Sequence, residues 1–176
     1  MRNKKYFSYA CIILLLLIVV LVIVITDKAT VSRKEMTAVT IINAEADSQH
    51  ITRPVSNLFD KNTKNTFWSS DENGESTTDT TVVLHLKGKS PICGVELYPC
   101  VIEETISYFP ETITISISED GESWKDVYTK KDYSVKNAEG QLFSFKPKED
   151  TEYVKIQMKS DSSYIRLSEM KVYEKK

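Results

Sequence analysis

The sequence has few of the residues on which most enzyme and metal sites depend. It contains 3 cysteines, 2 histidines and 5 glycines in 176 residues. The glycines are too widely dispersed for a phosphate-binding loop or a dinucleotide-binding fingerprint. No Gly-x-Ser-x-Gly, His-Glu-x-x-His, Cys-x-x-Cys or His-x-x-x-His motif occurs. These absences argue against hydrolases, nucleotide-dependent enzymes and structural zinc sites, and we predict that the chain is not an enzyme.

Positive charge is also scarce. The chain has 23 Lys and Arg against 25 Asp and Glu, a net charge of −2. Arg2, Lys4 and Lys5 are the only charged residues before Asp27, so residues 27–176 carry 20 basic and 25 acidic side chains, a net charge of −5. Nucleic-acid backbones are bound by basic surfaces. We therefore expect no nucleic-acid partner.

One long hydrophobic run stands at the start of the chain. Phe7 to Ile25 contains Ser8 as its only polar residue. As a helix this run would be about 28 Å long, close to the ~30 Å hydrocarbon thickness of a bilayer. We predict that residues 1–26 form a short cytoplasmic tail and a transmembrane signal anchor, with the C-terminal domain extracytoplasmic. A cleaved signal peptide is the alternative, although no small-x-small cleavage site precedes Ala29.

The two cysteines beyond this run lie in one stretch that is typical of a strand. Seven steps along an extended strand, at ~3.3 Å each, separate Cys93 from Cys100 by roughly 23 Å. A disulfide requires Cα atoms within about 7 Å. We therefore do not expect these two cysteines to be bonded to each other.

Short stretches of alternating hydrophobic residues dominate the chain from Val39 onward. Thr112–Ser118 alternates strictly, with three isoleucines on one face. The Asp120-Gly121 pair that follows is typical of a hairpin turn, after which Ser123–Tyr128 should return antiparallel. The same alternation recurs at Val82, Leu84 and Leu86, at Val95 and Leu97, at Phe143 and Phe145, and at Val154, Ile156 and Met158. The pattern predicts an all-β antiparallel sandwich or barrel in residues 39–176, behind a polar stalk of residues 27–38.

Several motifs taken together resemble the discoidin, or coagulation-factor type C, family. The segments that carry the resemblance are Asn57–Asn62 with Asn65–Ser70, Gly94–Pro99, Pro110–Ile117 with Ser118–Trp124, Glu152–Ile156, and Leu167–Tyr173. Their order and spacing are similar to the family across roughly residues 40–174. The resemblance implies a galactose-binding-like jelly-roll sandwich without catalytic activity, in which loops at one end bind glycans, lipids or proteins.

The resemblance also implies where a ligand would bind. In glycan-binding members an aromatic residue just before the Leu-x-Glu motif stacks on the sugar, and Tyr164 has that position. The histidine and arginine that usually contact galactose are replaced here by Ser69 and Cys100, so the standard galactose contacts are absent. Three alternatives stay open: the ligand differs, the loops Ser69–Thr80 and Val101–Phe109 supply other contacts, with Asp71 and Tyr108 as candidates, or nothing binds there. A buried loop tyrosine remains the alternative for Tyr164.

Two classes of partner follow from this resemblance. The first is a carbohydrate or cell-surface glycoconjugate recognised by a membrane-anchored module. The second is a protein partner, if the chain is a non-lectin interaction or assembly module of a membrane complex. A flat apolar patch would favour the protein, and an aromatic-lined hollow with polar groups would favour the glycan.

Many family members hold a structural calcium ion, and the resemblance places its ligands here at Asp60, Asn62, Thr66 and Glu169. Oxygen ligands of this kind suit Ca²⁺. Lys61 replaces the usual glycine of this loop, at a position where a positive φ is needed. Two interpretations stay open, a calcium site or an ordinary surface loop in which Lys61 neutralises Asp60.

Three aromatic or imidazole side chains are expected to be structural. Trp68 and Trp124 occupy core positions in the family that the chain resembles, and we predict both in the core. His85 alternates with core residues on a strand, so we predict it on the outer face of a sheet.

Overall fold

The computed structural model describes residues 31–72, 74–75, 77–161 and 164–176. Within these residues no helix is long and apolar enough to cross a membrane. The predicted span of Phe7–Ile25 lies outside them. Val31–Lys176 form one compact unit, and the buried hydrophobic residues described below all belong to it.

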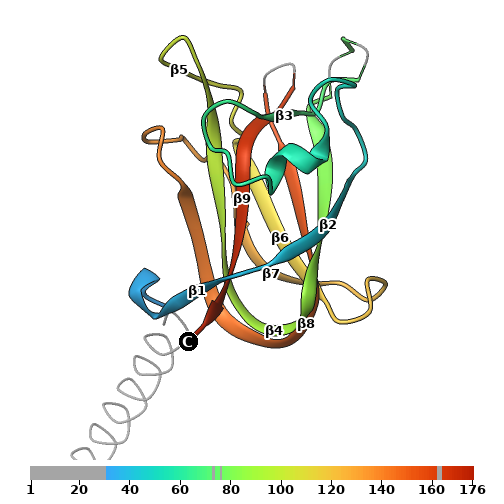
Figure 1. The fold of residues 1–176 in the computed structure, drawn as a ribbon, viewed down its shortest axis with the longest axis vertical. Coiled ribbons are helices and arrows are strands. Elements are labelled where there is room, and N and C mark those ends of the chain that lie inside the picture. The colour runs from blue at the N-terminus through green and yellow to red at the C-terminus, as the bar shows by residue number, and fades with distance from the viewer. Residues whose placement is uncertain (1–30, 73, 76, 162–163) are drawn as a thin grey trace, which may run out of the picture. The chain divides into compact units, whose positions relative to one another are not determined.

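This unit is an antiparallel β-sandwich (Figure 1). Its elements in chain order are η1 (Arg33–Glu35), β1 (Met36–Val39), β2 (Ile41–Ala46), η2 (Val55–Leu58), β3 (Trp68–Ser69), β4 (Asp79–Ile102), β5 (Thr105–Ser107), β6 (Thr112–Ser118), β7 (Lys125–Lys130), β8 (Gln141–Lys159) and β9 (Arg166–Lys175). One layer contains β2, β6, β7 and one half each of β4 and β8; the other contains β1, β3, β9 and the remaining halves. The predicted all-β sandwich is confirmed.

The two longest strands, β4 and β8, join the layers because each bends at the bottom of the domain in Figure 1. Their pairing runs from Val83 opposite Lys155 in one layer to Val95 opposite Phe143 in the other, with register shifts between. Gly88 lies at the bend of β4 with φ +102°, a conformation that side chains with a Cβ rarely adopt. The stretches that the sequence predicts as separate strands, at 82–86 and 95–97 and at 143–145 and 154–158, are therefore the two halves of β4 and the two halves of β8.

The core between the layers follows the alternation seen in the sequence. Ile113 and Ile115 are fully buried and Ile117 nearly so, and β7 returns antiparallel to β6 after the predicted turn. Trp68 is also fully buried, which confirms its predicted position. The hydrophobic effect of these buried side chains is the main stabilising term of the domain.

The prediction for Trp124 is wrong. Its side chain is half-buried and lies on the outer face of the sandwich, where the Lys155 ammonium is 4.3 Å from the centre of its ring. Trp124 follows the turn after β6 and precedes β7, so strand alternation does not direct it into the core. His85, by contrast, lies on the outer face as predicted, with its ring stacked on Tyr153.

The stalk prediction is also wrong for residues 31–38. Met36 lies opposite Lys175 where β1 pairs with β9, and its side chain is 6% exposed. The Lys176 N–H donates to the Glu35 carbonyl (2.8 Å). The folded domain therefore begins near Val31, because β1 is an edge strand of the sheet. This strand is short and follows charged residues, so the sequence pattern did not indicate it. Residues 27–30 lie outside the described residues.

Candidate functional site

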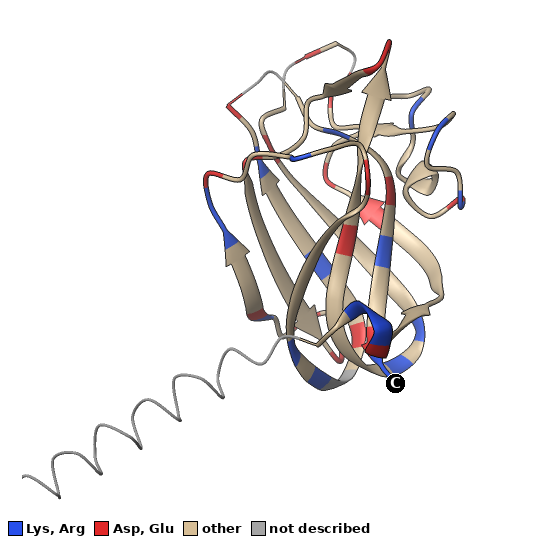
Figure 2. Ribbon diagram, turned by 90° about the vertical axis from the view of Figure 1, so that its left-hand side faces the viewer, with Lys and Arg blue, Asp and Glu red and all other residues tan. Residues whose placement is uncertain are grey.

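Backbone pairing ties together the loops at the top of the domain in Figure 1. β3 pairs with the start of β9, so that Trp68 lies opposite Leu167 and Ser69 opposite Arg166. The Arg166 N–H also donates to the Tyr108 carbonyl (2.9 Å). Three segments far apart in the sequence therefore meet at this end, with acidic and basic residues interspersed around them (Figure 2).

Tyr108, Tyr164 and Arg166 form a surface group that we call the tip cluster. The centres of the two tyrosine rings are 4.3 Å apart, and the ring planes are tilted by 47° to each other. The Arg166 guanidinium carbon lies 4.5 Å from the Tyr164 ring centre and 5.0 Å from that of Tyr108, and its Nη2 donates to the Tyr164 hydroxyl (3.2 Å). Tyr108 is 37% exposed and Tyr164 is half-buried. Cation–π and aromatic contacts thus hold two rings that still reach solvent.

A polar network lies directly beneath the tip cluster. Arg166 Nε donates to Ser69 Oγ (3.4 Å), and the Ser69 hydroxyl donates to one oxygen of Asp71. The other Asp71 oxygen is 4.0 Å from His50 Nε2. Ser69 is fully buried and Asp71 is 7% exposed. These two predicted ligand residues therefore lie under the surface, where they hold Arg166 in place.

Cys100, the third ligand residue predicted at this end, is also buried, at 1% exposure. Burial raises the pKa of its thiol, although the charges of Arg166 and Arg53 oppose the shift. A buried, protonated thiol offers little hydrogen bonding to a ligand. In this structure Cys100 is a packing group, and it is a free thiol, as is Cys93.

Sequence reasoning missed three residues at this end. The Arg53 and Arg166 guanidinium carbons lie 4.6 and 5.4 Å from the centre of the Phe67 ring. Arg166 could have been found, because it precedes Leu167 on a strand, and alternation directs a neighbour of a core residue outward. Arg53 and Phe67 lie in irregular loops, where no periodic pattern indicates which side chains meet.

The four residues predicted to bind calcium lie close together, as the resemblance implies. The carboxylate of Asp60 accepts the Asn62 N–H (2.8 Å) and the Thr66 hydroxyl (2.6 Å). The same hydroxyl lies 3.2 Å from the Asn62 carbonyl. Lys61 has φ +66°, a left-handed conformation that glycine adopts most readily. The loop therefore points several oxygen atoms toward one place.

Glu169 completes this group from β9. It is 3% exposed, and its Oε2 has no hydrogen-bond partner among the described residues. Burial and the nearby charge of Asp60 raise its pKa to about 7, while Lys171 and the Lys61 and Asn62 N–H groups oppose the shift. An orphaned buried carboxylate oxygen beside a second carboxylate fits a bound divalent cation, which would supply the missing partner. Within the described part of the chain no three Asp, Glu, His or Cys side chains are placed so that they could hold a metal ion together. Backbone and hydroxyl oxygens would therefore have to complete the shell.

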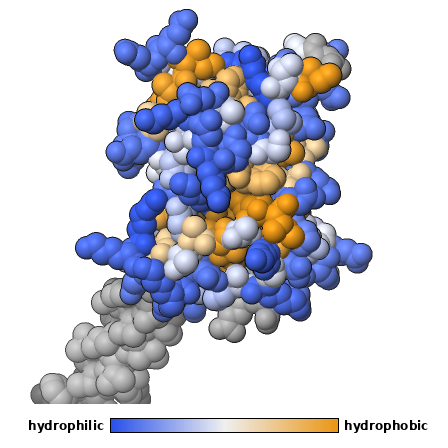
Figure 3. Space-filling model, viewed as in Figure 1, coloured by the Kyte–Doolittle hydropathy of each residue, from blue (hydrophilic) through white to orange (hydrophobic). Residues whose placement is uncertain are grey.

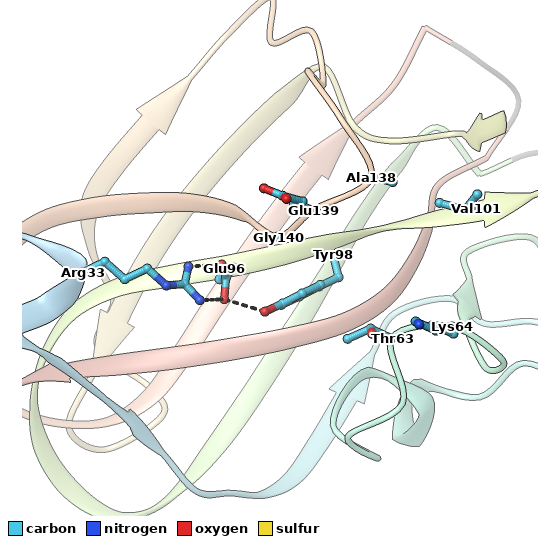
Figure 4. A pocket seen from close by; sticks show the side chains of 9 residues that line it. All are labelled: Arg33, Thr63, Lys64, Glu96, Tyr98, Val101, Ala138, Glu139 and Gly140. Atoms are coloured by element: carbon cyan, nitrogen blue, oxygen red, sulfur yellow. Dashed lines mark hydrogen bonds and ion pairs between the residues drawn. The ribbon is translucent and has the colours of Figure 1, made fainter. Parts of the chain in front are cut away.

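A separate hollow of about 760 Å³ lies on the outer face of β4 beside this loop (Figure 4). Its buried centre is Glu96, which accepts hydrogen bonds from Arg33 (3.0 Å at Nη2), Tyr98 (2.9 Å) and Tyr173 (2.6 Å). Burial alone would raise the pKa of Glu96, but these hydrogen bonds together lower it. The Glu96 carboxylate is therefore already hydrogen-bonded within the domain, and it links Arg33, at the start of the domain, to the sheet.

The fold and the loop site define a β-sandwich binding module, and comparison with known proteins agrees. The sequence model of the F5/8 type C domain matches residues 38–170, so the chain belongs to this family. No curated protein matches it in sequence.

The most similar solved structures include carbohydrate-binding modules. One is CBM32-3 from a family 31 glycoside hydrolase of Clostridium perfringens, with a TM-score of 0.63 and 16% identity over 84% of this chain and 95% of that one. The family 32 module of C. perfringens NanJ in complex with galactose has a TM-score of 0.63 and 21% identity, covering 82% and 98%. Chitosan-binding module 1 from a Paenibacillus sp. IK-5 chitosanase/glucanase has a TM-score of 0.60 and 21% identity, covering 74% and 93%. At these identities the likeness establishes the fold.

Proposed function

We propose that the domain is a non-catalytic carbohydrate-binding module that takes a sugar at the tip cluster. The observation that carries this proposal is the surface arrangement of Tyr108, Tyr164 and Arg166 at the loop end. The partly exposed rings offer a face for the C–H surface of a pyranose, and the guanidinium offers donors to hydroxyl groups. The similar modules named above include one bound to galactose and one that binds chitosan.

The sugar would be held differently from galactose in the family's usual arrangement. Ser69 and Cys100 occupy the positions of the usual histidine and arginine, and both side chains are buried. Arg166 instead reaches the surface from the start of β9 and is braced by Ser69. We infer that Arg166 supplies the charged donor that position 100 lacks, so that the preferred glycan differs from simple galactose.

We further propose that the domain is displayed outside the cell on a single-pass membrane anchor. The support is the sequence of Phe7–Ile25, which is long and apolar enough to span a bilayer and has no cleavage site after it. A weakly binding module gains from such tethering, because many copies on one surface bind a polymer with high avidity.

A structural calcium ion is part of the proposal. Asp60 and Glu169 would supply carboxylate oxygens, with the Asn62 carbonyl and the Thr66 hydroxyl beside them. The ion would neutralise the two acids and brace the loop that precedes Trp68. The unpartnered Glu169 oxygen supports this assignment over an ordinary surface loop.

One observation favours a second candidate, a protein-interaction module. Val101 and Ile102 are 41% and 37% exposed at the end of β4, and Figure 3 shows hydrophobic residues at the surface over β5, at the top of the domain. Exposed apolar side chains beside a binding loop can also contact protein.

A glycan array on the domain of residues 31–176, run in calcium and in EDTA, tests the leading proposal. We expect selective binding in calcium and weaker binding in EDTA. The matched variant Arg166→Lys keeps the charge but loses the planar donor fork, and we expect it to lose affinity at the same glycans. An array without signal in either condition would contradict the carbohydrate proposal and favour a protein partner.

A further inference from the structure

A second hollow, of about 310 Å³, lies on the outer face of the sheet formed by β2, β4, β8 and β6. Its lining reaches the turn between β6 and β7, which protrudes at the lower right of Figure 1, whereas the tip cluster lies at the top. The two sites are thus near opposite ends of the sandwich, and nothing in the resemblance to the family points to this one.

Three ring side chains form one part of this hollow. The His85 and Tyr153 rings are stacked, with centres 4.5 Å apart and planes within 15°. Trp124 lies beside them, half-buried, with the Lys155 ammonium 4.3 Å from its ring centre. The indole of Trp124 does not belong to the described hydrophobic core, unlike that of Trp68. Trp124 therefore contributes little to the core, and part of its surface lines the hollow instead.

Two polar side chains form the opposite wall. Asn43 and Glu45 lie on the same face of β2, because they are two residues apart, and they stand opposite His85 and Val83 on β4. Both are exposed. Neither side chain has a hydrogen-bond partner within the described ranges of the chain. An amide and a carboxylate thus face the hollow with their bonding capacity unused.

We propose that this hollow is a second carbohydrate site, one that takes one or two uncharged pyranose residues of a glycan chain. The ring side chains and Val83 present apolar surface to sugar C–H groups, while Asn43 and Glu45 offer hydrogen bonds to hydroxyls. The charges of Glu45 and Lys155 balance, which favours a neutral ligand. The volume is at the lower end of the range for small-molecule sites.

A second site changes what the module can do. Sites near opposite ends of one domain cannot hold the same sugar residue, but they can hold two chains or two parts of one long chain. Binding at one site raises the effective concentration of the polymer at the other. The module would therefore prefer polysaccharides to short sugars, whether or not the tip binds as proposed.

The test uses Trp124 as its reporter. The domain of residues 31–176 with the tip disabled by Tyr108→Ala and Tyr164→Ala is titrated with soluble oligosaccharides of β-1,4-linked glucose, mannose, galactose or N-acetylglucosamine. Their concentration is taken to about 10 mM, above a Kd of about 1 mM. The indole N–H resonance is followed by NMR. Trp68 is fully buried, so only Trp124 should respond.

We expect a saturable shift of the Trp124 resonance with at least one of these sugars. Asn43→Ala should weaken binding by roughly tenfold, a loss of about 1.4 kcal/mol. Gln157→Ala, an exposed amide on the same face of β8 but outside the hollow, should not. A Trp124 resonance that stays unmoved by all four sugars, or a shift that Asn43→Ala leaves unchanged, would overturn the proposal. Failure at the tip alone would appear in the unmodified domain as unmoved Tyr164 and Arg166 resonances, so the two proposals fail separately.

Discussion

The carboxyl of Glu169 links the metal site to stability, because it is buried and only partly hydrogen-bonded. Its pKa is about 7 in the folded domain without metal, against an ordinary value of 4.5. The folded state therefore keeps the proton at pH values where the unfolded chain has lost it. This contribution to stability is fully present below pH 4.5 and is lost as the pH rises through 7. At about 1.36 kcal/mol per pH unit, the loss is on the order of 3 kcal/mol.

The substitution Glu169→Gln isolates this effect. Glutamine has the shape of the protonated acid but does not titrate, so in EDTA at pH 8 the variant should be more stable than the unmodified domain by about 2–3 kcal/mol. Calcium should close most or all of this gap. It should stabilise the unmodified domain by about 2.7 kcal/mol at a hundredfold excess over its Kd, and more at pH 8 than at pH 5.5, because protons compete for Glu169. The variant should gain little.

Urea denaturation at pH 5.5 and 8, in calcium and in EDTA, measures all of these differences. Glu174→Gln is the matched control, since Glu174 is half-buried on the same strand and no described residue bonds its side chain. Parallel pH dependence of Glu169→Gln and the unmodified domain in EDTA would refute the raised pKa. Unfolding curves of the unmodified domain that coincide in calcium and EDTA would refute the metal site.

Three further predictions concern the rest of the chain. A Cβ at Gly140 would lie 2.5 Å from the Glu96 carboxylate, so Gly140→Ala should destabilise the domain by about 1–3 kcal/mol in urea denaturation; an unchanged midpoint would contradict this close approach. Trp68→Ala should lower the free energy of unfolding by about 3–5 kcal/mol, whereas Trp124→Ala should lower it by less than about 1 kcal/mol; equal losses would show that Trp124 is a core residue after all. The full chain should fractionate with membranes and lose its domain to protease added outside intact cells, because of Phe7–Ile25; a secreted soluble form would contradict the anchor.

Regular alternation explains why much of the fold was predictable. In β6 the isoleucines occupy every second position, and all three are buried, as the alternation predicts. In the turn that follows, Gly121 has a positive φ, which is what the Asp-Gly pair indicated. The bends of β4 and β8 were not predictable in this way. Gly88 and Pro91 interrupt the pattern as a loop would, and only the pairing partners across the sheet show that the strand continues.

The candidate sites were predictable only in part. The resemblance placed Asp60, Thr66 and Glu169 near one another, and in the structure they do lie close together, because the loop and the strand that carry them belong to the shared fold. Whether they bind a metal stays a prediction. At the tip it named Ser69 and Cys100, which are buried here. Side chains in loops are placed by contacts between distant segments, and a single sequence does not record those contacts.

The central claim is that the tip cluster binds a sugar, and Tyr164→Ala tests it most directly. The variant is titrated with the glycan that gives the strongest array signal, and its thermal unfolding is measured in parallel. Because Tyr164 is half-buried, we predict that most of the affinity disappears while the Tm stays within a few degrees. Tyr164→Phe, which keeps the ring, should retain most of the binding. Unchanged affinity in Tyr164→Ala, with stability lowered by about 3 kcal/mol or more as for a core residue, would contradict the account.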